Sequence, residues 1–178
     1  MIHSFEPVSP IFEKLKFNCE LNNLISNVFL NNLALGLKEE KTVVNLFRGL
    51  PSGHASISTL GREDYADFEI DIISLDRYIL DNNISKVDLV KCDVEGAEMM
   101  VIRGGKQLFS CKKAPILCIE LPIITSKYFG YTVRDLLLQL SEYGYSIFRI
   151  GKGNNSLCFP RSRRINSIRG LNVIDTSF

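Results

Sequence analysis

The sequence contains no tryptophan, only two histidines, and no C-x-x-C pair among its five cysteines. His3 and His54 have no cysteine or carboxylate partner at the spacing of zinc ligands, so no metal site is expected. Unpaired cysteines within apolar runs are typical of buried thiols in a reducing compartment, which predicts a cytoplasmic protein. Since Glu120 and Pro122 interrupt the most apolar run, no segment approaches the ~20 apolar residues of a membrane helix. We expect no association with membranes.

The sequence also lacks an excess of either basic or acidic residues. Lysine and arginine number 21 against 20 aspartate and glutamate, which gives a net charge of +1. A charged surface that attracts nucleic acid or anionic lipid is therefore not expected. The basic C-terminal tail, residues 161–178, is interpreted as a solvated surface rather than an anion site. With 178 residues, 46% of them apolar, the chain is expected to form one domain, residues 1–178.

Glycine-rich phosphate loops are also absent, because the chain has no G-x-G-x-x-G and no Walker motif. Short β-branched runs alternate with helical patterns, which is typical of an α/β fold. A short connection joins the last two runs and predicts an antiparallel hairpin. The expected strands end near Phe5 and cover residues 27–30, 42–47, 68–73, 87–93, 115–121, 145–150 and 156–159. The expected helices begin near Ser9, Ser74, Ala97 and Thr132.

Polar residues gather at the expected strand ends, and in open α/β sheets ligands bind beyond the carboxyl ends of parallel strands. Strand ends are often polar only because they face solvent, so a binding site and an exposed rim both remain open. Asp93 and Glu95 are more specific, since they follow a buried strand and precede Gly96, which allows close approach of a ligand. The residues at these ends are Glu6, Asn31, Asn32, Asp93, Glu95 and Glu120.

Two charged residues near this segment have simpler interpretations. Lys91 interrupts an otherwise apolar strand, where an unpaired ammonium group is costly, so we expect it to pair with a carboxylate. Glu98 lies near a helix start, where an acidic side chain favours the positive end of the helix dipole. We interpret Glu98 as a residue that stabilises the helix rather than as a catalytic residue.

The segment Val87–Glu98, VDLVKCDVEGAE, closely resembles the signature D-L-x-K-x-D-x-E-G-A-E of FkbM-type methyltransferases. The resemblance extends in register from residue 3 to about residue 160 and includes Phe5-Glu6-Pro7, Ser74-Leu75-Asp76 and Gly144-Tyr145. It implies a Rossmann-like, doubly wound, mostly parallel sheet with an antiparallel C-terminal hairpin. The fold class expected from the resemblance is therefore α/β.

The sequence departs from the family at its start. The family resembles other class I methyltransferases in placing a first strand and a glycine-rich loop before the F-E-P strand, and this sequence has neither. We therefore expect an N-terminally truncated methyltransferase domain that lacks its first central strand and binds its cofactor weakly. The two strands left without a neighbour can pair directly, accept residues 171–175 between them, or pair with a second chain. Direct pairing or a disordered N-terminal segment is expected rather than insertion, because residues 168–178 contain only one short apolar run.

The resemblance implies S-adenosylmethionine as the methyl donor and O-methyl transfer to a hydroxyl of a small molecule or sugar. Because this donor is already activated, the protein has to hold oxygen, carbon and sulfur in line while a carboxylate removes the proton. The alternative is a non-catalytic fragment or binding module that keeps the fold without binding the cofactor. The implied catalytic residues are Asp93, followed by Glu95 and Glu120. The implied cofactor-binding residues are Glu6 at the ribose hydroxyls, Asn32 and Ala34 beside the adenine, and Asp93 near the sulfonium.

Overall fold

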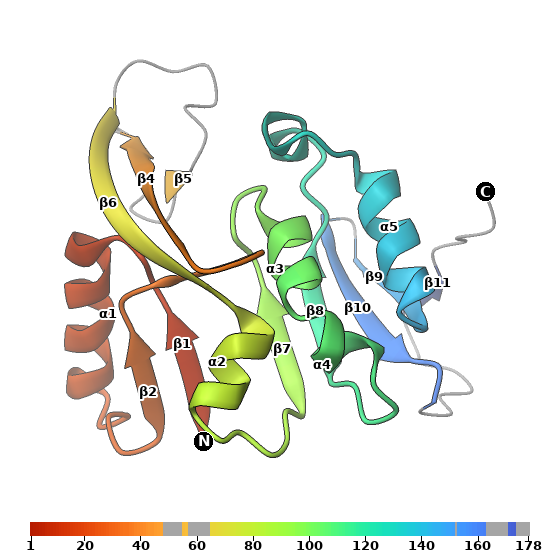
Figure 1. Ribbon diagram of the computed structural model, residues 1–178, viewed down its shortest axis with the longest axis horizontal. Helices are drawn as coiled ribbons and strands as arrows, with labels where there is room; N and C mark the ends of the chain where they lie inside the picture. Colours follow the sequence, from red (N-terminus) through yellow and green to blue (C-terminus); the bar gives the residue numbers. More distant parts are fainter. Residues whose placement is uncertain (48–54, 57–64, 152, 163–170, 174–178) are drawn as a thin grey trace. The chain divides into compact units, whose positions relative to one another are not determined.

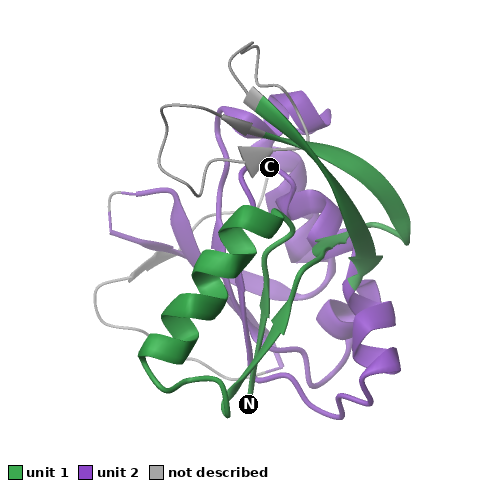
Figure 2. Ribbon diagram, turned by 90° about the vertical axis from the view of Figure 1, so that its left-hand side faces the viewer, with its two compact units in different colours: residues 1–74 green, residues 75–178 purple. Residues whose placement is uncertain are grey.

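The computed structural model describes residues 1–47, 55–56, 65–151, 153–162 and 171–173 (Figure 1). The chain divides into two compact units, Met1–Ser74 and Leu75–Phe178 (Figure 2). Both units combine helices with strands, so the expected α/β class is confirmed. The assignment of all 178 residues to one domain stays a prediction.

The first unit begins with a strand, helix and strand in which the two strands are parallel. Strand β1, Ile2–Phe5, pairs with β2, Val28–Asn31, and the helix α1, Ser9–Leu21, connects them. Pro10 lies in the first turn of α1, where a missing backbone N–H breaks no helical hydrogen bond. All three elements lie where the sequence predicted them.

Ser9, which could have capped α1, does not do so. Val8 is the N-cap residue, and Ser9 is the first residue of the helix. The Ser9 hydroxyl instead donates a hydrogen bond to Asn32 Oδ1 at 3.1 Å. This contact ties the start of α1 to the segment that follows β2.

A second sheet of the first unit has the strand order β3-β6-β4-β5. Its strands are β3, Ala34–Gly36; β4, Glu40–Phe47; β5, Ala55–Ser56; and β6, Tyr65–Ser74. Strands β4 and β6 extend the two predicted runs, whereas β3 and β5 are too short to produce a periodic pattern and were not predicted. The buried core of this unit consists of Val8, Val44, Ile70 and Ile72, with Ile11, Ala34 and Phe68 packed against it.

The second unit contains a five-stranded sheet with the order β11-β9-β10-β8-β7. Strands β7 and β8 are parallel, whereas β10 is antiparallel to both β8 and β9, so the expected C-terminal hairpin is confirmed. The strands are β7, Leu89–Cys92; β8, Ile116–Glu120; β9, Tyr145–Ile150; β10, Asn155–Pro160; and β11, Leu171–Val173.

The helices α3, α4 and α5 lie over one face of this sheet (Figure 1). Thr132 and Asp135 form the predicted capping box at the start of α5. Fully buried side chains at this layer include Met99, Ile102, Phe109, Leu117, Ile119, Leu136, Leu140, Tyr145 and Ile147. The helices of the unit are α2, Leu75–Asp81; α3, Glu98–Gly104; α4, Lys106–Ser110; the 3₁₀ helix η1, Thr125–Phe129; and α5, Val133–Glu142.

Two expectations about the sheet are corrected, and one of the alternatives is excluded for the described strands. The parallel pairs are β1–β2, β3–β6 and β7–β8, and the other described pairs are antiparallel, so a mostly parallel sheet is wrong for these strands. Strands β1 and β7 belong to different sheets, so the expected direct pairing is not among the described pairs. The C-terminal run does not insert beside β7, because β11 pairs with β9 at the other end of the sheet.

Two further expectations concern the tail and the membrane. In the basic tail, the Arg161 N–H donates to Gly144 O at 2.8 Å and its guanidinium donates to Ser141 Oγ at 2.9 Å, whereas residues 163–170 and 174–178 lie outside the described residues. Within the described ranges, no helix has both the length and the apolar character that crossing a membrane requires.

Candidate functional site

Two acidic side chains meet where β7 and β8 end. The parallel register, from Leu89 opposite Ile116 to Cys92 opposite Ile119, brings the carboxyl ends of both strands to the same edge. Asp93 follows β7 directly, and Glu120 is the last residue of β8. The two side chains are close enough for the charge of Asp93 and hydrogen bonding with it to contribute to the raised pKa of Glu120. The sequence therefore placed this pair of residues correctly.

The environment of Glu120 favours its protonated form. Burial raises the pKa of Glu120 to about 7, and the negative charge of Asp93, its hydrogen bond, and the charges of Glu95 and Glu98 act in the same direction. Glu120 therefore exchanges its proton at about pH 7. Titration in this range suits a group that exchanges protons with a substrate.

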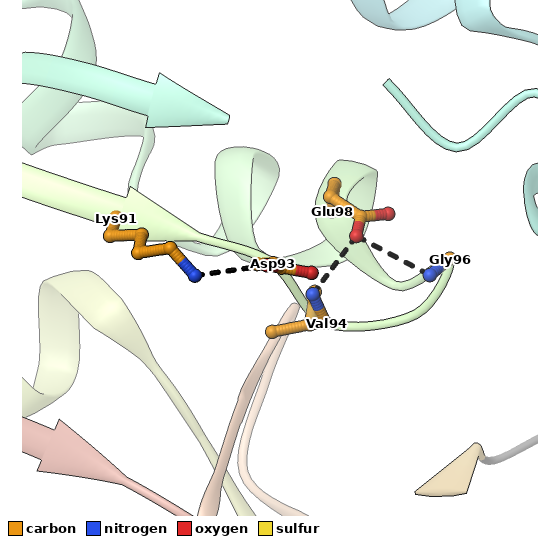
Figure 3. Close-up of polar contacts among 5 residues, drawn as sticks. All are labelled: Lys91, Asp93, Val94, Gly96 and Glu98. Carbon is orange, nitrogen blue, oxygen red and sulfur yellow. Dashed lines mark hydrogen bonds and ion pairs between the residues drawn. The ribbon is translucent and has the colours of Figure 1, made fainter. Parts of the chain in front are cut away.

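Lys91 pairs with Asp93 as expected. Its Nζ lies 2.9 Å from Asp93 Oδ2 (Figure 3), and the Lys91 side chain is largely exposed. The hydrogen bond to Asp93 raises the pKa of Lys91, so the ammonium group stays charged. This positive charge offsets part of the negative charge that the carboxyl groups concentrate at the edge of the sheet.

The loop that follows Asp93 has an unusual backbone. Glu95 has φ of 52° and Gly96 has φ of 111°, so two successive residues lie at positive φ. For Glu95 this conformation costs about 1 kcal/mol or more, whereas glycine adopts it readily. The side chain of Phe129 packs against Gly96 so closely that a Cβ there would lie 2.8 Å from the ring. The surrounding structure thus imposes this conformation.

The buried side chain of Glu98 stabilises the loop that follows Asp93. Its side chain is fully buried, and Oε1 accepts hydrogen bonds from Val94 N at 3.0 Å and Gly96 N at 3.4 Å (Figure 3). Tyr131 Oη lies 3.1 Å from Glu98 Oε2 and 2.8 Å from Gly96 O. Glu98 lies in the first turn of α3 as expected, but its side chain bonds the loop and not only the helix. Tyr131 was missed, because nothing in its local sequence links it to residues more than thirty positions away.

Strand β10 brings two asparagines to the same edge. Asn155 is opposite Glu120 in the antiparallel register, and Leu121 N donates to Asn154 O at 2.9 Å. The sequence placed both asparagines only in the hairpin turn. Their position beside Glu120 depends on β10 pairing with β8, which the local pattern does not encode.

Glu6 and Asn32 lie together in the first unit, at the carboxyl ends of β1 and β2. Asn32 Nδ2 donates to Glu6 O at 2.9 Å and to Pro7 O at 3.0 Å, while Glu6 Oε1 accepts from Val8 N at 2.8 Å. Burial raises the pKa of Glu6, and the hydrogen bond from Val8 opposes this shift. Ala34, the other residue implied beside the adenine, is the first residue of β3.

The predicted site residues thus form two groups. Asp93 and Glu120 come together at one edge of the second unit, and the negative charge of Glu95 contributes to the raised pKa of Glu120. Glu6 and Asn32 come together in the first unit. These two groups belong to different compact units of the chain.

Comparisons with known proteins agree with this architecture. Residues 1–147 match the methyltransferase FkbM domain. A curated relative, "Methyltransferase 1" of Beauveria bassiana (strain ARSEF 2860), is 28% identical over 124 residues, which cover 58% of this chain and 48% of the relative. The crystal structure of methyltransferase FkbM from Methylobacillus flagellatus KT is similar in fold, with a TM-score of 0.52 and 18% identity.

The matched part is only a portion of both relatives. The chain spans about half the length of the curated relative, and the structural match covers 88% of this chain but 36% of the solved one. At 18% identity the structural match bears on the fold alone. The family match, by contrast, covers most of the chain, including β1, the carboxyl pair and the loop held by Glu98. The chain belongs to the FkbM methyltransferase family.

Proposed function

We propose that this chain carries the methyl-transfer site of an S-adenosylmethionine-dependent O-methyltransferase. Its acceptor is a hydroxyl group of a small molecule or saccharide. The observation that carries the proposal is the Asp93–Glu120 pair, two carboxyl groups that the parallel register brings to one edge of β7 and β8, where burial and the charge of Asp93 raise the pKa of Glu120 to about 7. Membership of the FkbM family supplies the reaction class.

Asp93 and Glu120 act as the base. The acceptor hydroxyl would approach the pair, and its proton would pass to a carboxylate as its oxygen takes the methyl group, while the bond from that methyl group to sulfur breaks and leaves a neutral thioether. Lys91 holds one oxygen of Asp93 and limits the movement of that side chain. S-adenosylmethionine, when bound, supplies a methyl group on a positively charged sulfur, so no further activation of the donor is needed. Most of the rate enhancement then comes from positioning.

The residues of the first unit that we propose as cofactor ligands suit the ribose of S-adenosylmethionine. Glu6 is a half-buried carboxylate at the carboxyl end of a parallel strand, the location where Rossmann-like folds bind ribose hydroxyls. Asn32 fixes the backbone at Glu6 and Pro7 through its amide group, and we assign it, with Ala34, to the border of the adenine site. Asp93 is assigned to the methyl-transfer end of the cofactor.

The pH dependence of the reaction tests the shared base. For the longest natural reading frame that contains this chain, we expect kcat to rise as pH increases through about 7, because Glu120 loses its proton there and the pair becomes the stronger base. The substitution Glu120→Gln removes the titrating group, so the rise near pH 7 should disappear and the maximal kcat should fall by about tenfold or more. Rates are measured with the best acceptor from a panel of alcohols and sugars.

A matched control is Glu142→Gln, which changes an exposed glutamate on α5. It should leave both the pH profile and kcat unchanged. If the Glu120→Gln variant keeps the wild-type rise near pH 7, the carboxyl pair is not the base, and the proposed role of Glu120 is wrong.

A further inference from the structure

We propose that Glu98 and Tyr131 form an uncharged, buried clasp that positions the loop from Asp93 to Gly96, with Glu98 in its protonated form. The positioning of Asp93 as the base rests on the proposed function, whereas the clasp itself does not. Glu98 touches the loop and not the edge where the substrate is placed, so it is a positioning residue. Its contacts are the amides of Val94 and Gly96 and the Tyr131 hydroxyl.

The number of hydrogen atoms available to Tyr131, Gly96 and Glu98 indicates that the Glu98 side chain is a neutral carboxylic acid. Tyr131 has one hydroxyl hydrogen but lies within hydrogen-bond distance of two oxygens, Gly96 O at 2.8 Å and Glu98 Oε2 at 3.1 Å. A carbonyl oxygen has no hydrogen to give, so the shorter contact uses the hydrogen of Tyr131. The contact to Glu98 is then a hydrogen bond only if Glu98 donates. A protonated Oε2 satisfies both contacts, while Oε1 accepts from Val94 N and Gly96 N.

The surroundings of Glu98 also favour the neutral form. The side chain is completely buried, and an unpaired carboxylate is costly in such a place. Among the described contacts, none of the hydrogen bonds to Glu98 comes from a lysine or an arginine. Burial raises the pKa of Glu98, and the hydrogen bonds from the backbone amides oppose this, as would Tyr131 if it donated to Glu98 instead of to Gly96 O. The nearby titratable groups are Cys92, Glu120 and Tyr131. Burial also raises the pKa of Tyr131, so its hydroxyl keeps its hydrogen.

The clasp acts on the segment that carries the base. Val94 is the residue after Asp93, and its N–H is fixed to Glu98. Two residues further on, Gly96 is held at both its N–H and its carbonyl, by Glu98 and Tyr131 respectively. The clasp therefore stabilises the backbone of Glu95 and Gly96 at positive φ and sets the direction in which Asp93 leaves β7.

Substitutions of Glu98 separate a neutral clasp from a charged one. In Glu98→Gln, Oε1 still accepts from both amides and Nε2 donates to Tyr131, so the pattern of the protonated acid is kept. Amide hydrogen exchange at Val94 and Gly96 should then stay within about threefold of wild type, whereas Glu98→Ala should accelerate it by about tenfold or more. Tyr131→Phe, which keeps the ring, should accelerate exchange at Gly96 and provides the test if Glu98→Ala does not fold.

Infrared spectroscopy observes the proton directly. The difference spectrum between wild type and Glu98→Gln at neutral pH should contain the carbonyl band of a protonated carboxylic acid. A carboxylate band in its place, or exchange in Glu98→Gln as fast as in Glu98→Ala, overturns the proposal. Neither measurement needs methyl transfer, so failure of the proposed function leaves both results interpretable. In an active enzyme, the kcat lost in Glu98→Ala should be restored in Glu98→Gln, with similar KM values throughout.

Discussion

Replacing Asp93 by asparagine is expected to lower kcat for methyl transfer by about 10²- to 10⁴-fold, the usual contribution of a general base. Asparagine has nearly the same shape as aspartate but has no carboxylate that could take the proton from the hydroxyl group of the substrate. It also removes the charge that pairs with Lys91 Nζ at 2.9 Å. Because the shape of the site is kept, the dissociation constant for S-adenosylmethionine should change by less than about threefold. Steady-state kinetics and calorimetry measure the two quantities.

Asp88 provides a matched control for Asp93. It is an exposed aspartate just before β7, at the other end of the same strand, and it forms an ion pair with Lys86 at 2.6 Å. Asp88→Asn also removes one charge and one ion pair and should leave kcat within about twofold of wild type. Equal losses of kcat and cofactor affinity in Asp93→Asn would instead identify Asp93 as a ligand of the cofactor.

Replacing Gly96 by alanine is expected to destabilise the fold by about 3 kcal/mol, the sum of backbone strain and overpacking. The backbone at Gly96 has φ of 111°, which side chains other than glycine rarely adopt. An added Cβ would lie 2.8 Å and 2.9 Å from two ring atoms of Phe129 and 3.0 Å from Thr125 Cβ. Denaturant unfolding, followed by circular dichroism, measures the loss.

Gly144→Ala separates these two causes. Gly144 has φ of 85°, but no atom lies within 4 Å of the position of an added Cβ, so this substitution has only the backbone cost of about 1 kcal/mol. Phe129→Ala should relieve part of the cost of Gly96→Ala in the double variant, as expected for residues in contact. A Gly96→Ala variant no less stable than Gly144→Ala would show that Phe129 moves aside freely and does not shape the loop.

The strands that carry the acidic pair were predictable because each has a strong local pattern. Val87 to Asp93 and Pro115 to Glu120 are largely apolar runs that end in acidic residues, and a helical pattern stopped by Gly104 and Gly105 separates them. A parallel pair connected by helices follows from this order. The meeting of Asp93 and Glu120 at one edge is then a consequence of the topology. The ion pair of Lys91 with Asp93 follows instead from their spacing, because residues two positions apart along a strand lie on the same face.

The internal support of the site could not be predicted in the same way. Glu98 has the sequence context of an ordinary residue at a helix start, and its complete burial depends on η1 and Tyr131 folding back over the loop. The same holds for β11, since a three-residue run can pair with any free strand edge, and its partner β9 is determined only in the assembled sheet. Short strands and buried polar contacts both depend on tertiary structure rather than on local periodicity.

The most direct test of the central claim is the fate of a labelled methyl group. The product of the longest reading frame that contains this chain is incubated with S-adenosylmethionine labelled in its methyl group and with a panel of small alcohols and saccharides. We predict that the label appears as an O-methyl ether, with one S-adenosylhomocysteine formed per ether, and that Asp93→Asn lowers the rate at which both products form by about 10²- to 10⁴-fold. A folded protein that does not bind S-adenosylmethionine, or one that transfers the label only to nitrogen or carbon, would contradict the claim.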